Sequence, residues 1–275
     1  MPKLSKYERE QVAAIARWQA ETPGVLSRAF GIAVEPLAWI IRKVVPTAAV
    51  RGALDSSNAF ALWLTDTKDV VRDGGVAAIS DLRTKEIKLS DSLANEVHNW
   101  AIGMAVAEGA GTGAFGILGA PVDIPAIITI ALRTIHKVGA CYGFECSSEL
   151  DRKFALSVLA ASGANTVEEK ASALAALRLI EVTIAKVTWK QMSYKAAENQ
   201  FGKEMAIISL KNLAKQLGIN LTKRRALAAI PAIGALVGGS VNGWYVKEVG
   251  WAARRAFQER WLLENGKIDP PAVDG

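Results

Sequence analysis

Residues 99–135 read NWAIGMAVAEGAGTGAFGILGAPVDIPAIITIALRTI, and Glu108, Asp123 and Arg133 are their only charged side chains. Two apolar arms flank a glycine-rich centre that runs from Gly109 to Gly119. Each arm is shorter than the roughly 20 apolar residues that a membrane-spanning helix needs. The pattern therefore predicts a hydrophobic helical hairpin, either buried inside the protein or dipped into one leaflet of a membrane.

The rest of the chain has the same helical periodicity. Capping boxes at Ser5/Glu8 and Thr166/Glu169 predict two helix starts, and Asp73-Gly74-Gly75 predicts a turn or helix end. Alanine is frequent throughout, and no period-2 alternation is long enough for a sheet. We expect helical stretches over 5–22, 25–45 (interrupted at Pro36), 47–64, 90–108, 121–143, 166–195 and 202–217. Ser90 or Asp91 is the expected start of the helix that runs to 108. The fold class is all-α: one multi-helix bundle over 1–265 with glycine-rich hydrophobic hairpins, followed by a flexible tail over 266–275.

Composition excludes two classes of protein. The 275 residues are 51% hydrophobic, which excludes a disordered chain, and two cysteines are too few for a disulfide-stapled secreted domain. The N-terminus has no apolar core typical of a secretory signal peptide, so we expect a cytoplasmic protein with reduced cysteines. The Cys141/Cys146 spacing, without a second pair, does not predict a zinc site.

A second uncharged stretch covers residues 226–246, ALAAIPAIGALVGGSVNGWYV. Its 21 residues match the length of a membrane span. Pro231, Asn242 and four glycines argue against a simple span, while small residues four apart allow close backbone approach in a membrane or in a protein interior.

The positive charge of the chain is concentrated near its C-terminus. Residues 186–261 hold 13 Lys and Arg against 4 Asp and Glu, whereas residues 1–185 are nearly balanced. Trp beside Arg is typical of a membrane interface, so we expect one at Arg224, Arg225, Trp244, Trp251, Arg254 and Arg255. The alternative is an ordinary helix with Trp packed inward and Arg reaching outward. No nucleic-acid-binding motif accompanies these residues, so a nucleic-acid partner is disfavoured.

Polar residues within the two uncharged stretches are the candidate ligand-binding residues. Glu108 and Asp123 are equally far from the hairpin centre and would face each other across its neck. They could contact a polar headgroup, cap their helices, or form a metal-binding or acid–base pair. Arg133 shares a helical face with His136, and Asn242 is the polar residue of the second stretch. The Gly111-x-Gly113-x-x-Gly116 pattern follows no predicted strand, so we expect no nucleotide and no other cofactor.

Two blocks of sequence resemble the EcsC protein family. The first comprises Gly119-Ala-Pro-Val-Asp123-Ile-Pro125, Leu132-Arg133-Thr-Ile and Tyr142-Gly143-Phe144. The second comprises Ala229-Ile-Pro231-Ala-Ile-Gly234, Asn242, Val249-Gly250-Trp-Ala-Ala-Arg254-Arg255 and Arg260-Trp261-Leu262. The resemblance covers about residues 20–265 and implies a bacterial, largely helical, hydrophobic protein. It also implies an association with membrane transporters, because the gene of the family's namesake lies beside those of an ABC transporter. It implies no particular reaction.

Three functions remain open on this basis. The first is a cytoplasmic, peripherally membrane-associated protein that binds a lipid or other amphiphile and is an accessory to a membrane transporter. The second is a metal-assisted hydrolase that uses Glu108 and Asp123. The third is an interaction subunit that docks its apolar surface on a membrane protein. The sequence favours the first and leans away from an enzyme.

Overall fold

The computed structural model describes residues 4–22, 61, 65–113, 120–146, 148–164, 166–190 and 231–270. Within these ranges every regular element is a helix, which confirms the all-α prediction. In chain order the helices are α1 (Lys6–Ala20), α5 (Lys68–Asp73), the 3₁₀ helix η1 (Ile79–Thr84), α6 (Ile87–Gly113), α7 (Ala120–Cys141), α8 (Glu149–Gly163), α9 (Val167–Lys190) and α12 (Pro231–Glu264).

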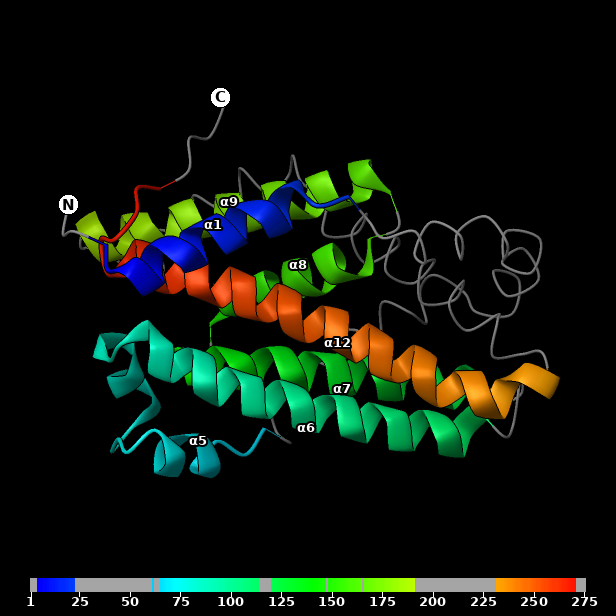
Figure 1. Ribbon diagram of the computed structural model, residues 1–275. Coiled ribbons are helices and arrows are strands. Elements are labelled where there is room, and N and C mark those ends of the chain that lie inside the picture. The colour runs from blue at the N-terminus through cyan, green and yellow to red at the C-terminus, as the bar shows by residue number, and fades with distance from the viewer. Residues whose placement is uncertain are drawn as a thin grey trace.

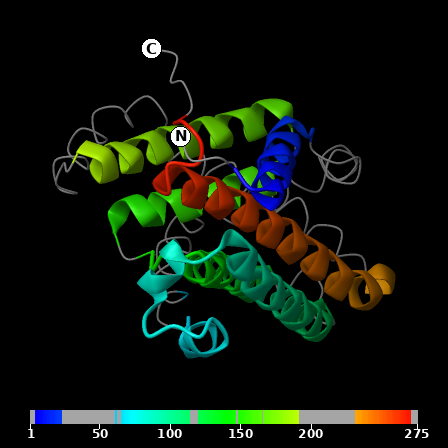
Figure 2. The same cartoon turned by 60° about the vertical axis from the view of Figure 1, so that its left-hand side comes forward.

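Helix α12 is the centre of the bundle. It crosses between α6 and α7 on one side and α1, α8 and α9 on the other (Figures 1 and 2), and it contacts all five. Its core side chains, such as Val246, Val249, Ala253 and Phe257, are almost fully buried. The apolar side chains of α12 are spread around its circumference, as expected for a helix with neighbours on several sides.

Glycines let α6 approach α12 closely. A β-carbon on Gly243 would lie 2.5 Å from a methyl group of Val106, and one on Gly250 would lie 2.2 Å from the His98 ring. These glycines are seven residues apart and so share one face of α12. The close approach predicted for the small residues of 226–246 is thus seen at Gly243, against a helix of the same protein.

Local signals set several helix ends. Ser5 and Glu8 form the predicted capping box, and the Glu169 backbone N–H donates to Thr166 Oγ1 at 3.2 Å. Gly74 ends α5, and Gly75 follows with φ of 59°, a value that favours glycine. A third capping box, Ser148/Asp151, starts α8 and was not predicted.

The hydrophobic hairpin is α6 followed by α7, which lie side by side (Figure 1). Helix α6 is longer than expected, because it begins at Ile87 and continues to Gly113, inside the segment predicted to turn. Among the described helices, none is both long and apolar enough to cross a membrane. The expected helical stretches over 25–45 and 202–217 lie outside the described residues, as do all of 47–64 except residue 61 and residues 226–230 of the second uncharged stretch.

The first residues after α12 pack against the helical bundle. The Lys267 ammonium lies 3.0 Å from a Glu8 carboxylate oxygen, and Ile268 packs partly buried against the core. Residues 271–275 lie outside the described ranges, so the predicted flexibility of the tail stays a prediction.

Candidate functional site

A cavity of about 460 Å³ lies where α5 and the residues before it pack against α6 and α7. This volume is within the range of small-molecule sites. We call it the α5–α7 cavity. Its walls carry four acids (Asp66, Asp69, Asp73, Glu96), two bases (Arg133, Lys137) and four apolar side chains (Val70, Leu93, Val97, Trp100).

The charges of this cavity are held in defined positions. The Lys137 ammonium lies 2.5 Å from Asp69, and the Arg133 guanidinium lies over the Trp100 ring, 4.7 Å from its centroid. A hydrogen bond from the Lys68 backbone N–H keeps the pKa of Asp66 below its usual range, and the charges of Lys68, Lys137 and Arg133 act in the same direction. The cavity therefore offers both negative and positive groups to a ligand.

A shallow apolar groove, with a volume of about 30 Å³, adjoins the same cavity between α6 and α7. Four residues line both, namely Val97, Trp100, Arg133 and Lys137, and Met104 and Ile130 are among those that line only the groove. Trp100 is 50% exposed and Met104 is 44% exposed, four residues apart on one face of α6. The ionic cavity thus opens onto an exposed apolar surface.

A buried polar cluster surrounds Asp91, which is 1% exposed. The hydroxyl of Tyr7 donates to Asp91 at 2.5 Å, the Gln258 amide donates at 2.6 Å, and the hydroxyl of Tyr142 donates as well. Arg254 Nε lies 3.5 Å away. Burial and the hydrogen bond to Asp91 raise the pKa of Tyr7 to about 12, so its phenol stays protonated and donating. The cluster joins α1, α6, α12 and the end of α7.

The placement of Arg254 differs from the sequence prediction. It was expected at a membrane interface or reaching outward, yet it is 9% exposed and hydrogen-bonded to Asn95 beside Asp91. The buried negative charge of Asp91 explains this inward orientation, because a buried carboxylate requires a compensating cation. Sequence reasoning assigned Asp91 only as a possible helix start and missed its role, since its partners lie 51 to 167 residues away.

A second buried ion pair lies near the end of α12. Arg260 is 3% exposed and donates to Asp151 at 2.7 Å and to Glu264 at 2.9 Å. Its guanidinium also lies 4.1 Å from the centroid of the Phe144 ring. Burial opposes ionisation of Asp151, but the Arg260 charge prevails and lowers its pKa. This pair connects α8 to α12.

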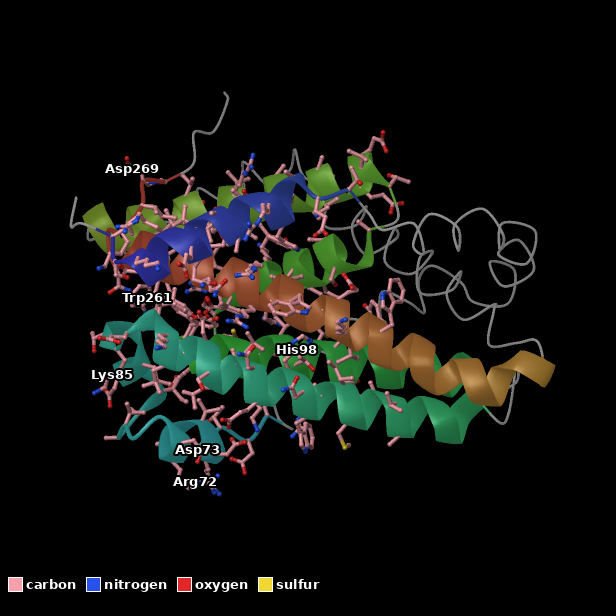
Figure 3. The ribbon with its side chains drawn as sticks, in the orientation of Figure 1. Arg72, Asp73, Lys85, His98, Trp261 and Asp269 are labelled. Carbon is pink, nitrogen blue, oxygen red and sulfur yellow. The ribbon has the colours of Figure 1, made fainter. Side chains whose placement is uncertain are left out.

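The two histidines are buried and neutral at pH 7. Burial lowers the pKa of His136 to about 4, and it also lowers the pKa of His98. His98 is labelled in Figure 3, where it lies between α6 and α12; its Nε2 is 3.0 Å from the Lys247 carbonyl oxygen. His136 is therefore a poor partner for an anionic ligand. Its predicted role in ligand binding stays untested.

The remaining predicted ligand residues are placed only by their helices. Glu108 lies on α6, Asp123 on α7 and Asn242 on α12, but their side chains are outside the described structure. Arg133 lines the α5–α7 cavity. Among the described residues, no group of three or more His, Cys, Asp or Glu side chains could hold a metal ion.

The predicted membrane-interface residues divide in a similar way. Arg224 and Arg225 lie outside the described residues, and Trp244 is half-buried on α12. Trp251 and Arg255 line a separate cavity between α1 and α12. Membrane contact by these residues stays a prediction.

Comparison of the sequence with known proteins identifies matches in one protein family. The model of the EcsC protein family matches residues 9–262. The protein named "Uncharacterized protein YdbA" of Bacillus subtilis (strain 168) is 20% identical over 213 residues, which cover 74% of this chain and 72% of that protein. "Protein EcsC" of the same organism is 25% identical over 161 residues, which cover 58% of this chain and 59% of that protein. No solved structure matches the chain.

Proposed function

The chain belongs to the EcsC protein family, and from that premise and the α5–α7 cavity we propose that it is a cytoplasmic, peripherally membrane-associated protein that binds a lipid or similar amphiphile. The observation that carries the proposal is the direct continuation of a cavity with charges of both signs into an exposed apolar groove. An amphiphile likewise consists of a charged headgroup joined to an apolar chain.

The headgroup is expected to carry a positive and a negative charge. Asp66, Asp73 and Glu96 on the cavity wall would attract an ammonium group, and Arg133 and Lys137 would attract a phosphate. Since four acids and two bases line the cavity, a purely anionic headgroup is disfavoured there. A zwitterionic phospholipid or lysophospholipid fits this arrangement of charges best.

The acyl chain would lie along Trp100 and Met104. Burial of apolar surface contributes about 25 cal/mol per Å², so covering these half-exposed side chains favours binding. The same side chains would also suit contact with a transporter subunit, because exposed apolar residues mark protein interfaces. A metal-assisted hydrolase would depend on Glu108 and Asp123, whose side chains lie outside the described structure, so it stays a prediction.

Titration with a zwitterionic lysophospholipid below its micelle concentration tests the proposal, with the heat of binding in isothermal titration calorimetry as the readout. We expect saturable binding that weakens about tenfold or more in Arg133→Gln and in Trp100→Ala. Val167→Ala is the matched control, because Val167 is 54% exposed on α9, away from the cavity. Equal affinity in wild type and both cavity variants would contradict the proposed site.

A further inference from the structure

A cavity of about 690 Å³ lies between the last two turns of α1 and the middle of α12. We call it the α1–α12 cavity. Three cations line it, Arg17, Lys247 and Arg255. It shares no lining residue with the α5–α7 cavity. The two cavities are therefore separate, and a ligand in the α1–α12 cavity does not presuppose the amphiphile proposed for the other.

Arg255 is the fixed cation of this cavity. Its Nη1 donates to the amide oxygens of Gln11 at 3.0 Å and Gln258 at 2.7 Å, and its guanidinium carbon lies 5.4 Å from the centroid of the Trp251 ring. Both hydrogen-bond partners are neutral. Within the described part of the chain it forms no ion pair, although it is half-buried.

A half-buried cation without a carboxylate is unusual, since buried charges in proteins are generally paired. The acid nearest in the network is Asp91, which already accepts three hydrogen bonds and faces Arg254. Burial and the neighbouring Arg254 charge lower the pKa of Arg255, so the charge of the guanidinium is incompletely compensated.

The surroundings strengthen the positive potential. Arg17 and Lys247 are exposed on the two walls and form no ion pair with any residue that the structure describes. Two acids, Glu21 and Glu248, also line the cavity. Burial lowers the pKa of the nearby Lys170, and the charges of Glu21 and Glu248 oppose this shift by stabilising its ammonium. Lys170 also donates to the Trp18 and Glu21 carbonyl oxygens and so neutralises the negative end of α1.

We infer that the α1–α12 cavity is a binding site for a phosphomonoester group, held by Arg255 and flanked by Arg17 and Lys247. Arginine offers paired N–H donors that match phosphate oxygens, and Nη1 alone is used by the glutamines. Trp18 and Trp251 supply apolar walls for the organic part of the ligand. The group can come from a soluble phosphorylated metabolite or from a lipid such as phosphatidic acid.

Calorimetric titration with inorganic phosphate and with glycerol phosphate tests the site, and sedimentation with vesicles tests the lipid source. The vesicles are phosphatidylcholine with and without a fifth of phosphatidic acid. We expect one saturable site that weakens about tenfold or more in Arg255→Gln and in the double variant Arg17→Gln/Lys247→Gln. Glu21→Gln removes a repelling charge and should tighten binding.

The double variant Lys85→Gln/Lys88→Gln is the matched control, because it removes the same charge from exposed positions on η1's end and α6. Binding of the soluble phosphates assigns the site to a metabolite, and binding only of the phosphatidic acid vesicles assigns it to a lipid headgroup. If Arg255→Gln fails to fold, the Arg17→Gln/Lys247→Gln variant decides. No binding of any probe, or equal weakening in the control, would overturn the inference.

Discussion

Replacement of Asp91 by asparagine should destabilise the protein more than almost any other single polar substitution. The change keeps the shape of the side chain and removes one buried negative charge. It leaves the Arg254 guanidinium, 9% exposed and 3.5 Å from Asp91, without its counter-charge. It also weakens the hydrogen bonds from Tyr7, Tyr142 and Gln258.

The expected cost follows from the burial of the pair. Breaking a buried ion pair by removing one partner costs about 3–5 kcal/mol, because the other charge stays in a medium of low dielectric constant. A domain has a total stability of about 5–15 kcal/mol, so the loss is a large fraction of it. Urea unfolding at pH 7, followed by tryptophan fluorescence, measures the difference.

Two further variants keep this prediction decisive. Glu96→Gln changes an exposed carboxylate on the same helix and should alter stability by less than about 0.5 kcal/mol. The double variant Asp91→Leu/Arg254→Met should recover much of the loss, because it removes both charges together. An Asp91→Asn protein within about 1 kcal/mol of wild type would refute the view that this cluster holds α1, α6 and α12 together.

Three other predictions concern packing, pH and thiol reactivity. Gly250→Ala should cost about 1–3 kcal/mol in urea unfolding because its β-carbon meets a buried ring, whereas Gly103→Ala, with open space around it, should be neutral or stabilising. The pKa of His136 is about 4 in the folded state and near 6.5 when unfolded, so the unfolded state binds more protons between these values. The free energy of unfolding should therefore fall by up to about 3 kcal/mol as the pH drops from 6.5 to 4, and His136→Gln should reduce this pH dependence. The same pH dependence in wild type and His136→Gln would contradict a neutral buried imidazole. Burial raises the pKa of both Cys141 and Cys146, so neither thiol should react with a disulfide reagent before urea unfolds the protein, and rapid labelling of the native protein would contradict their burial.

Local sequence signals predicted the helices well. The capping box at Ser5, the side-chain cap at Thr166 and the turn at Gly74 depend on residues within four positions of one another, so their spacing is visible in the sequence. The apolar arms of 99–135 likewise predicted α6 and α7. The start of α6 was misplaced at Ser90 or Asp91, because these polar residues are typical of a helix cap.

Long-range partners could not be predicted in the same way. The residues next to Asp91 in the sequence predict only a helix cap. Tyr7 and Gln258 come close to its carboxylate only when the chain folds. Arg254 was predicted to lie at a membrane interface for the same reason, since no residue near it in the sequence indicates that it pairs with a buried acid. The two cavities also depend on segments far apart in the chain, such as Asp66 with Arg133 and Arg17 with Arg255. Of the predicted ligand residues, Arg133 lines the α5–α7 cavity, whereas the side chains of Glu108, Asp123 and Asn242 lie outside the described structure.

The central claim is that the α5–α7 cavity and its apolar groove hold one amphiphile. Native mass spectrometry of the protein, purified without detergent and mixed with a zwitterionic lysophospholipid, measures this directly. We predict one bound lipid per chain in the wild type and a strong loss of that species in Trp100→Ala/Arg133→Gln, with Val167→Ala unchanged. A wild-type spectrum without bound lipid, or equal occupancy in the cavity variant, would contradict the claim.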